Sequence, residues 1–383
     1  MKKVWDKWTR IALVKRILVG LILGAILGIA VPQATGIAIL GDVFVSALKA
    51  IAPLLVFFLV ISSLCNAGKS HGGVIKTVII LYMFSTVLAA VIAVFASMAF
   101  PVKMTLANAA TDTSAPQGIV EVLNNLLLNV VANPVSSLVN ANYVGILMWA
   151  VLLGLAFRAA DKMTKKVLAD VADGISMVVT WIINLAPFGI FGLVFNTVST
   201  NGLDIFTTYG KLLLLLVGCM LFIYFVTNPL LVYWCIRQNP YPLIFQCLKR
   251  SALTAFFTRS SAANIPVNMK VCEEMGLDRD TYSVTIPLGA TINMDGAAIT
   301  ITVMTMATAF TLGIHVDIPT AIILSLLAAL SACGASGVAG GSLLLIPMAC
   351  SLFGISDDIS MQVVAVGFII GVVQDSVETA LNS

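Results

Sequence analysis

A series of long apolar segments constrains the fold of this chain more than any other feature. Each is close to the roughly 20 residues that a helix needs to cross a bilayer. Hydrophobic residues make up 60% of the 383 residues and charged residues only 10%, whereas soluble domains carry about 25% charged residues. The sequence therefore predicts an all-α polytopic membrane protein. The spans predicted before residue 240 are 17–32 with its flanks, 43–65, 77–100, 142–158, 175–199 and 212–236.

Basic residues alternate between the two ends of these spans. The segments 1–16, 66–76, 158–166 and 237–250 contain most of the Lys and Arg, while the intervening loops carry only Lys103 and Lys211. Because Lys and Arg concentrate in cytoplasmic loops, the N-terminus is predicted to lie in the cytoplasm. The run 17–32 lacks a small-residue cleavage site, so we expect a retained first helix. The apolar region 118–140, interrupted by asparagines and a proline, predicts a partial span or helix pieces beside the fourth span.

The pattern changes after residue 240. Four further segments follow, and two of them contain small and polar interruptions, "TRSSAANIP" and "SACGASGVAGGS". Irregular backbone at membrane depth is tolerated only where it is buried in protein or lines a cavity. We therefore expect two helix–tip–helix hairpins that each enter and leave on one side. The predicted elements are hairpin 243–272, helix 281–312, hairpin 319–353 and helix 360–383.

The two hairpin–helix units resemble each other. Pro266 in the first unit stands 29 positions before Asp295, and Pro347 in the second stands 28 positions before Asp375. With one hairpin entering from each side, this spacing predicts an inverted-topology repeat. Such repeats hold binding sites near the bilayer midplane, at broken helices.

Polar residues inside these units are the candidate site. A carboxylate at membrane depth is expensive and needs a partner or a function. In "TINMDG", Asn293, Asp295 and Gly296 predict a helix break whose free carbonyls and side-chain oxygens suit Na⁺; the alternative is a salt bridge from Asp295 to Arg259 or Lys49. The intramembrane candidates are Arg259, Asn293, Asp295, Asp375, Glu378 and Asn382.

The tip of the first hairpin suits the carboxylate of a zwitterionic substrate. A helix that begins inside the membrane presents N–H groups and a positive dipole end to a carboxylate, and Ser260, Ser261 and Asn264 add donors there. Asp375 is a partner for an ammonium group. An amino acid needs a partner for its carboxylate and another for its ammonium group. These residues alone do not distinguish an amino acid from a dicarboxylate as the substrate.

Four motifs resemble the dicarboxylate/amino acid:cation symporter family, the glutamate-transporter homologues. They are "FFTRSSAANIPVNM", "SVTIPLGATINMDGAA", "GASGVAGG" and "QDSVETALNS". The likeness extends over most of the chain and is most specific after residue 250, and within the family it favours the bacterial branch that carries serine and threonine with sodium. The resemblance implies eight transmembrane helices plus two re-entrant hairpins, a scaffold, a moving transport domain and a homotrimer.

The resemblance also implies sodium sites. One uses an Asn at 382 and an Asp a few residues beyond; this chain ends at Ser383, which suggests a piece of a longer protein. The others use backbone carbonyls around the break, and hydroxyls of the third helix with the Asn and Asp of the break. The implied sodium ligands are Tyr82, Ser85, Thr86, Thr291, Asn293, Met294, Asp295, Ala332, Cys333, Ala335 and Asn382.

For the substrate, the resemblance implies that tip amides and Asn382 hold the carboxylate and that Asp375 meets the amino group. Two positions depart from acidic-substrate members, which carry Thr at 297 and Arg at 378, where this chain has Ala297 and Glu378. An Arg would grip a side-chain carboxylate bidentately, whereas Glu378 repels acids and suits a hydroxyl donor. The implied substrate residues are Arg259, Ser260, Ser261, Ala262, Ala297, Val338, Gly340, Asp375, Glu378, Thr379 and Asn382.

The resulting hypothesis is a bacterial plasma-membrane symporter that imports L-serine and L-threonine with Na⁺ by elevator-type movement. It needs no organic cofactor and no nucleic acid. The alternatives are a sodium- or proton-coupled carrier of dicarboxylates or acidic amino acids and, more remotely, an ion channel; an enzyme is not expected. The expected division is scaffold 1–76 and 102–200, and transport domain 77–101 and 209–383.

Overall fold

The computed structural model describes residues 11–66, 73–106, 127–128, 130–203, 205–335 and 340–383. All regular elements in these ranges are helical, which confirms the predicted all-α class. The first half contains α2 (Leu13–Ala30), α3 (Ile39–Asn66), α4 (Gly73–Ala99), α6 (Pro134–Val139), α7 (Tyr143–Ala156), α8 (Lys162–Asn184) and α9 (Ala186–Asn201). The second half contains α10 (Ile205–Phe222), α11 (Asn228–Ile236), α12 (Tyr241–Cys247), α13 (Leu253–Thr258), α14 (Ser261–Glu274), α15 (Arg279–Ile292), α16 (Asp295–Thr311), α17 (Ile318–Ala332), α18 (Ile346–Ser351) and α19 (Asp357–Leu381). Short 3₁₀ or π turns precede or join several of these helices.

Six helical stretches of the described residues are long and apolar enough to cross a bilayer. They are Thr35–Asn66, Lys76–Ala99, Lys162–Asn184, Ile205–Ile236, Arg279–Thr311 and Asp357–Leu381. Many large apolar side chains on the outside of the bundle are exposed, as expected where lipid rather than water is the surrounding solvent. The chain is therefore an integral membrane protein.

One predicted span is wrong. The segment 175–199 is not a single helix, because α8 ends at Asn184 and α9 begins at Ala186. Pro187 stands in the first turn of α9, and a proline has no N–H with which to continue the ladder of α8. The apolar helix α8 instead begins at Lys162, in a lysine-rich segment that was expected to be a loop.

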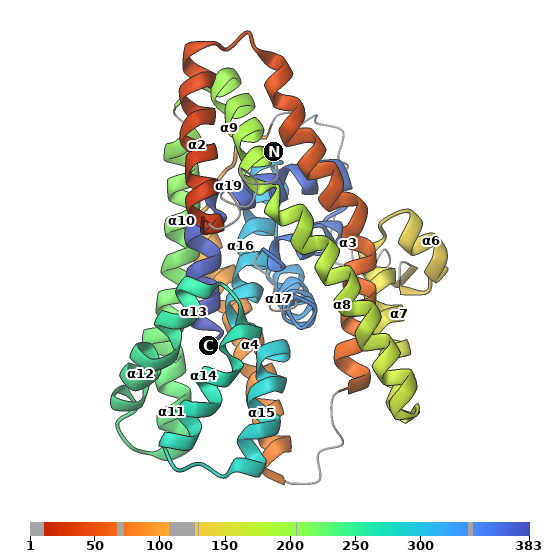
Figure 1. Ribbon diagram of the computed structural model, residues 1–383, viewed down its shortest axis with the longest axis vertical. Helices are drawn as coiled ribbons and strands as arrows, with labels where there is room; N and C mark the ends of the chain where they lie inside the picture. The colour runs from red at the N-terminus through yellow and green to blue at the C-terminus, as the bar shows by residue number, and fades with distance from the viewer. Residues whose placement is uncertain (1–10, 67–72, 107–126, 129, 204, 336–339) are drawn as a thin grey trace.

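Helices α2 and α9 run side by side along one end of the molecule (Figure 1). Gly20, Gly24 and Gly28 of α2 face the backbone of α9. An added Cβ would come within 2.2 Å of the Pro187 carbonyl oxygen at Gly20, and within 2.6 Å of the Phe191 oxygen at Gly24. Only glycine permits this approach, and such spacing of small residues is a common way to pack membrane helices. We call this contact the glycine seam.

The long helices α16 and α19 are mostly buried and lie near the centre of the bundle (Figure 1). Every residue from Asp295 to Ala309 is buried. Asn293 and Met294, between α15 and α16, have non-helical backbone angles. The predicted break at "NMDG" is therefore confirmed, and it places the polar start of α16 inside the protein.

The first predicted hairpin has its turn at Arg259, whose φ of 53° ends α13 in a left-handed conformation. Ser260 then starts α14 by accepting a hydrogen bond from the Ala263 N–H. In the second predicted hairpin, α17 forms the first arm and α18 lies in the returning arm. Its glycine-rich tip, residues 336–339, lies outside the described residues.

Candidate substrate and sodium site

The carboxylate of Asp295 lies among hydroxyl and amide oxygens from two segments of the chain. The Ser85 hydroxyl on α4 is 2.8 Å and 3.0 Å from the two oxygens of Asp295 and 3.1 Å from Oδ1 of Asn293. The Thr86 hydroxyl is 3.0 Å from Asp295 Oδ1. Asp295 is only 3% exposed, and no described Lys or Arg forms an ion pair with it. We call this set the Asp295 cluster.

The chemistry of the Asp295 cluster suits a small hard cation. One full negative charge and several neutral oxygens converge in a site that keeps out bulk water. The Ser85 hydroxyl has a single hydrogen to donate and three acceptors within reach, so the lone pairs outnumber the donors. Oxygen-only ligation of this kind is what alkali and alkaline-earth cations prefer in proteins.

The predicted alternative for Asp295 is wrong. Lys49 pairs with Asp357 at 3.0 Å and with Asp358 at 2.7 Å, at the start of α19. Arg259 pairs with Asp375. Neither cation pairs with Asp295, so its charge is not used in a structural salt bridge within the described chain.

Tyr82, grouped with this cluster by the resemblance, is oriented differently. Its hydroxyl donates to the Thr285 carbonyl oxygen at 3.2 Å and lies over Gly289. Tyr82 therefore joins α4 to α15 ahead of the break, rather than donating to Asp295.

The predicted carbonyl ligands lie near the same break. The Cys333 thiol, just after α17, is 3.8 Å from the Ile292 carbonyl oxygen at the end of α15. The side chain of Asn382 accepts a hydrogen bond of 2.8 Å from the Gly296 N–H and approaches the Met294 sulfur at 3.4 Å. The break between α15 and α16, the first arm of the second hairpin and the end of α19 thus meet.

Asp375 on α19 forms a buried ion pair. Its Oδ2 lies 2.7 Å from Nε of Arg259, and the side chains of Arg259 and Asp375 are 10% and 5% exposed. Its other oxygen accepts from the Gly340 N–H at 3.2 Å. Nη1 of Arg259 is buried and has no hydrogen-bond partner among the described residues. Asp375 therefore joins the tip of the first hairpin to the second, and the Nη1 amino group of Arg259 is left without a partner in the described part of the chain.

Glu378, one turn further along α19, is held by three donors on a single oxygen. Thr300 of α16 and Ser342, within the second predicted hairpin, donate to Oε2 at 2.8 Å and 2.9 Å. Gln374 contacts the same oxygen at 2.5 Å and Thr300 at 2.7 Å. All side-chain hydrogen bonds to this carboxylate within the described chain end on Oε2, so Oε1 is the oxygen left for another donor.

Thr300, Ser342 and Gln374 were not predicted from the sequence. Gln374 precedes Glu378 by four residues and Thr300 follows Gly296 by four, so both spacings place the pairs on one helix face. That signal was available. The spacing does not show which helix face points to a neighbouring polar residue. Other threonines of α16, such as Thr308, bond to the backbone of their own helix.

The remaining predicted substrate residues differ in burial and in their hydrogen-bond partners. Ser261, Ala297 and Thr379 are buried, and the Thr379 hydroxyl donates to the Asp375 backbone oxygen. Asn264 is buried and donates to Ser251 across the first hairpin, not toward Asp375. Val338 lies outside the described residues.

A buried polar site at helix breaks, inside a bundle of membrane-spanning helices and with an oxygen cluster for a cation, defines a membrane transport protein rather than an enzyme. The chain belongs to the sodium:dicarboxylate symporter family, whose model matches residues 13–383.

Full-length relatives share more than half of their residues with this chain. It is 59% identical over 384 residues to the serine/threonine transporter SstT of Bifidobacterium adolescentis, covering all of this chain and 89% of that protein. It is 56% identical to the proteins of the same name from two strains of Streptococcus thermophilus, covering all of this chain and 96% of each. These matches agree with the family that the sequence motifs resemble.

Proposed function

We propose that this chain imports serine and threonine together with Na⁺, using the Asp295 cluster and the acids Asp375 and Glu378 of α19. The observation that carries the proposal is the direct link between them. Asn382, which caps the C-terminal end of α19, accepts from the N–H of Gly296, the residue after Asp295. Sodium bound at the break therefore fixes the helix that carries Asp375 and Glu378, which is a physical route for coupling ion to substrate.

Sodium at the Asp295 cluster would be held by Asp295, Asn293, Ser85 and Thr86. A second sodium would use carbonyls near Thr291, Met294 and the end of α17. The closeness of Cys333 to the Ile292 carbonyl supports this second position. A third would involve Asn382.

The substrate ammonium would bind Asp375, and the substrate carboxylate would meet the tip at Ser261 and Ala262. Because Asp375 already pairs with Arg259, the ammonium must replace or rearrange that pair. The substrate hydroxyl would donate to Oε1 of Glu378. The names of the relatives, which are serine/threonine transporters, support this substrate class.

The proposed architecture has eight transmembrane helices and two re-entrant hairpins, with the N-terminus in the cytoplasm of a bacterial cell. Helices α2, α3 and α6–α9 would form a scaffold, assembled as a homotrimer. Helices α4 and α10–α19 would move as the transport domain, and the second hairpin, around Gly340 and Gly341, would be the outer gate. Between α3 and α19, the half-exposed Lys49 pairs and the edge-on contact of Phe44 with Phe368 are contacts that can be exchanged, which supports a moving boundary there.

The direct test is uptake of labelled L-serine into proteoliposomes with and without an inward Na⁺ gradient, with L-threonine and L-aspartate as competitors. The proposal predicts saturable, Na⁺-dependent uptake that threonine blocks and aspartate does not. Block by aspartate would instead support an acidic amino acid carrier. Uptake that is the same with and without the Na⁺ gradient would refute the sodium site. A flux that does not saturate with serine concentration would favour a channel.

A further inference from the structure

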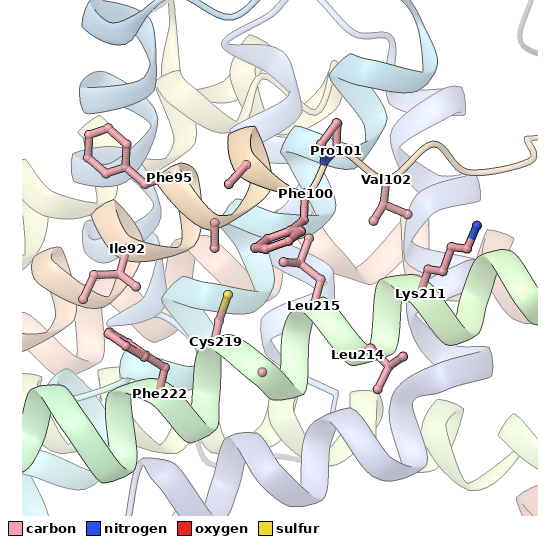
Figure 2. Close-up of a pocket in the computed structure, with 13 residues that line it drawn as sticks. Ile92, Phe95, Phe100, Pro101, Val102, Lys211, Leu214, Leu215, Cys219 and Phe222 are labelled. Carbon is pink, nitrogen blue, oxygen red and sulfur yellow. The ribbon is translucent and has the colours of Figure 1, made fainter.

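An apolar groove lies on the outer surface of α4 and α10, away from the polar site. It has a volume of about 900 Å³ and is lined by residues 92–102 of α4 and its extension and residues 211–222 of α10. In Figure 2, Phe95, Phe100 and Phe222 are among the side chains that line the groove, and Lys211 stands at one end with its ammonium directed away from the apolar lining. The groove is thus an apolar hollow with one cation at its end.

Small residues create the hollow. Gly218 in α10 has no atom within 4 Å of the position that a Cβ would occupy. Ala96 and Ala99 stand opposite on α4. The neighbouring Leu214 is 74% exposed. Two membrane helices that packed closely against each other would fill this space with side chains.

The dimensions of the groove match one leaflet. From Lys211 to Phe222 is eleven residues of helix, or roughly 16 Å, and half of a bilayer's hydrocarbon core is about 15 Å. Lys211 lies near the end of the α4–α10 pair where α4 terminates at Ala99. With the end of α4 at the membrane surface, the charged end of the groove would lie at headgroup depth and Phe222 near the midplane.

Among the described residues, Lys211 is the only charged one in the lining, and no described carboxylate forms an ion pair with it. A single cation at headgroup depth attracts an anionic phosphate. The groove spans about one leaflet, which matches the length of one acyl chain better than that of a helix crossing the whole bilayer. We propose that the groove binds one acyl chain of an anionic phospholipid, with its phosphate at Lys211.

Tryptophan fluorescence of the full chain in proteoliposomes tests this proposal. Leu214→Trp places a reporter in the groove, and Leu221→Trp places one on the same helix outside it. Brominated phosphatidylglycerol and brominated phosphatidylcholine are the two quenchers, and the signal of the five native tryptophans is subtracted with the parent protein. We expect the reporter at position 214 to prefer phosphatidylglycerol about fivefold, a ratio that corresponds to one lysine contact, and the reporter at position 221 to show no preference.

Two substitutions in the Leu214→Trp protein, each with a matched control, identify the cause. Lys211→Gln should abolish the preference, whereas Lys76→Gln, at the other end of α4, should not. Gly218→Phe should fill the groove and remove the preference; Gly210→Phe, equally free of neighbours within 4 Å, is its control. Equal quenching by both lipids in the Leu214→Trp protein would show ordinary lipid contact and overturn the proposal. Absence of quenching by either would show that protein covers the groove, and would also overturn it.

Discussion

Nε of Arg259 lies 2.7 Å from Oδ2 of Asp375, and this buried pair joins the turn of the first hairpin to α19. Removing one partner of a buried pair leaves the other charge unpaired and costs about 3–5 kcal/mol. Asp375→Asn should therefore lower the free energy of unfolding by about that amount and abolish serine uptake. Thermal unfolding in detergent and uptake in proteoliposomes measure the two effects.

The double variant Arg259→Gln/Asp375→Asn separates stability from function. It should recover most of the lost stability, because no buried charge is left alone, while uptake stays absent. Arg250→Gln, which breaks the half-exposed pair of Arg250 with Glu274, is the control and should change stability by less than about 1 kcal/mol. Recovered uptake in the double variant would show that Asp375 does not bind the substrate ammonium.

Asp295→Asn should raise the Na⁺ concentration needed for half-maximal uptake by at least roughly tenfold, because it removes the only full charge of the cluster. Thr86→Ala should give a smaller increase, since it removes one neutral oxygen. The measurement is serine uptake against Na⁺ concentration at constant ionic strength. An unchanged Na⁺ dependence in both variants would exclude this cluster as a sodium site.

Glu378→Arg should reduce serine uptake and produce uptake of L-aspartate. The guanidinium would replace an acid that repels a side-chain carboxylate with a group that binds one bidentately. Competition between labelled aspartate and serine measures the switch. Glu378→Gln is the matched control: it removes the charge without adding a cation, so it should not gain aspartate uptake.

Gly296→Ala should separate α16 from α19. Its Cβ would meet Cγ of Glu378 at 2.8 Å and the Glu378 carbonyl oxygen at 2.9 Å, and overpacking of this kind costs about 1–3 kcal/mol. We expect a lower unfolding temperature and impaired Na⁺ coupling. Gly210→Ala has open space at its Cβ and should leave both unchanged.

Gly340→Val should stop uptake. Gly340 has φ of 74°, its N–H contacts Asp375, and a Cβ would lie 2.9 Å from the Phe368 ring. Gly313→Val carries a similar backbone strain, with φ of 72°, but meets no neighbour, so it is the control for strain alone. Similar losses of uptake in the two variants would remove the case for Gly340 as part of the gate.

Local chemistry made the helix break and the first hairpin turn predictable. "NMDG" combines residues that compete with helical hydrogen bonding, and "TRSS" supplies an N-cap at Ser260. The partner of Arg259 was not predictable in this way. Asp295, Asp375 and Glu378 are all buried acids, and the choice of Asp375 depends on how α13 and α19 pack.

The donors around Glu378 escaped prediction for the same reason. Thr300, Ser342 and Gln374 come from three separate elements, and each alone resembles an ordinary polar residue of a membrane helix. The boundary between α8 and α9 was not predicted, for a different reason. Apolar character continues across Leu185, and hydropathy does not register the missing N–H of Pro187.

The glycine seam between α2 and α9 has a mechanical consequence. With backbone against backbone at Gly20 and Gly24, there are no long side chains whose rotamers could adapt if one helix slid along the other. Every displacement along the seam would drive carbonyl oxygens into Cα atoms. This pair therefore resists sliding, so we expect any movement of one part of the bundle past another to occur along other contacts.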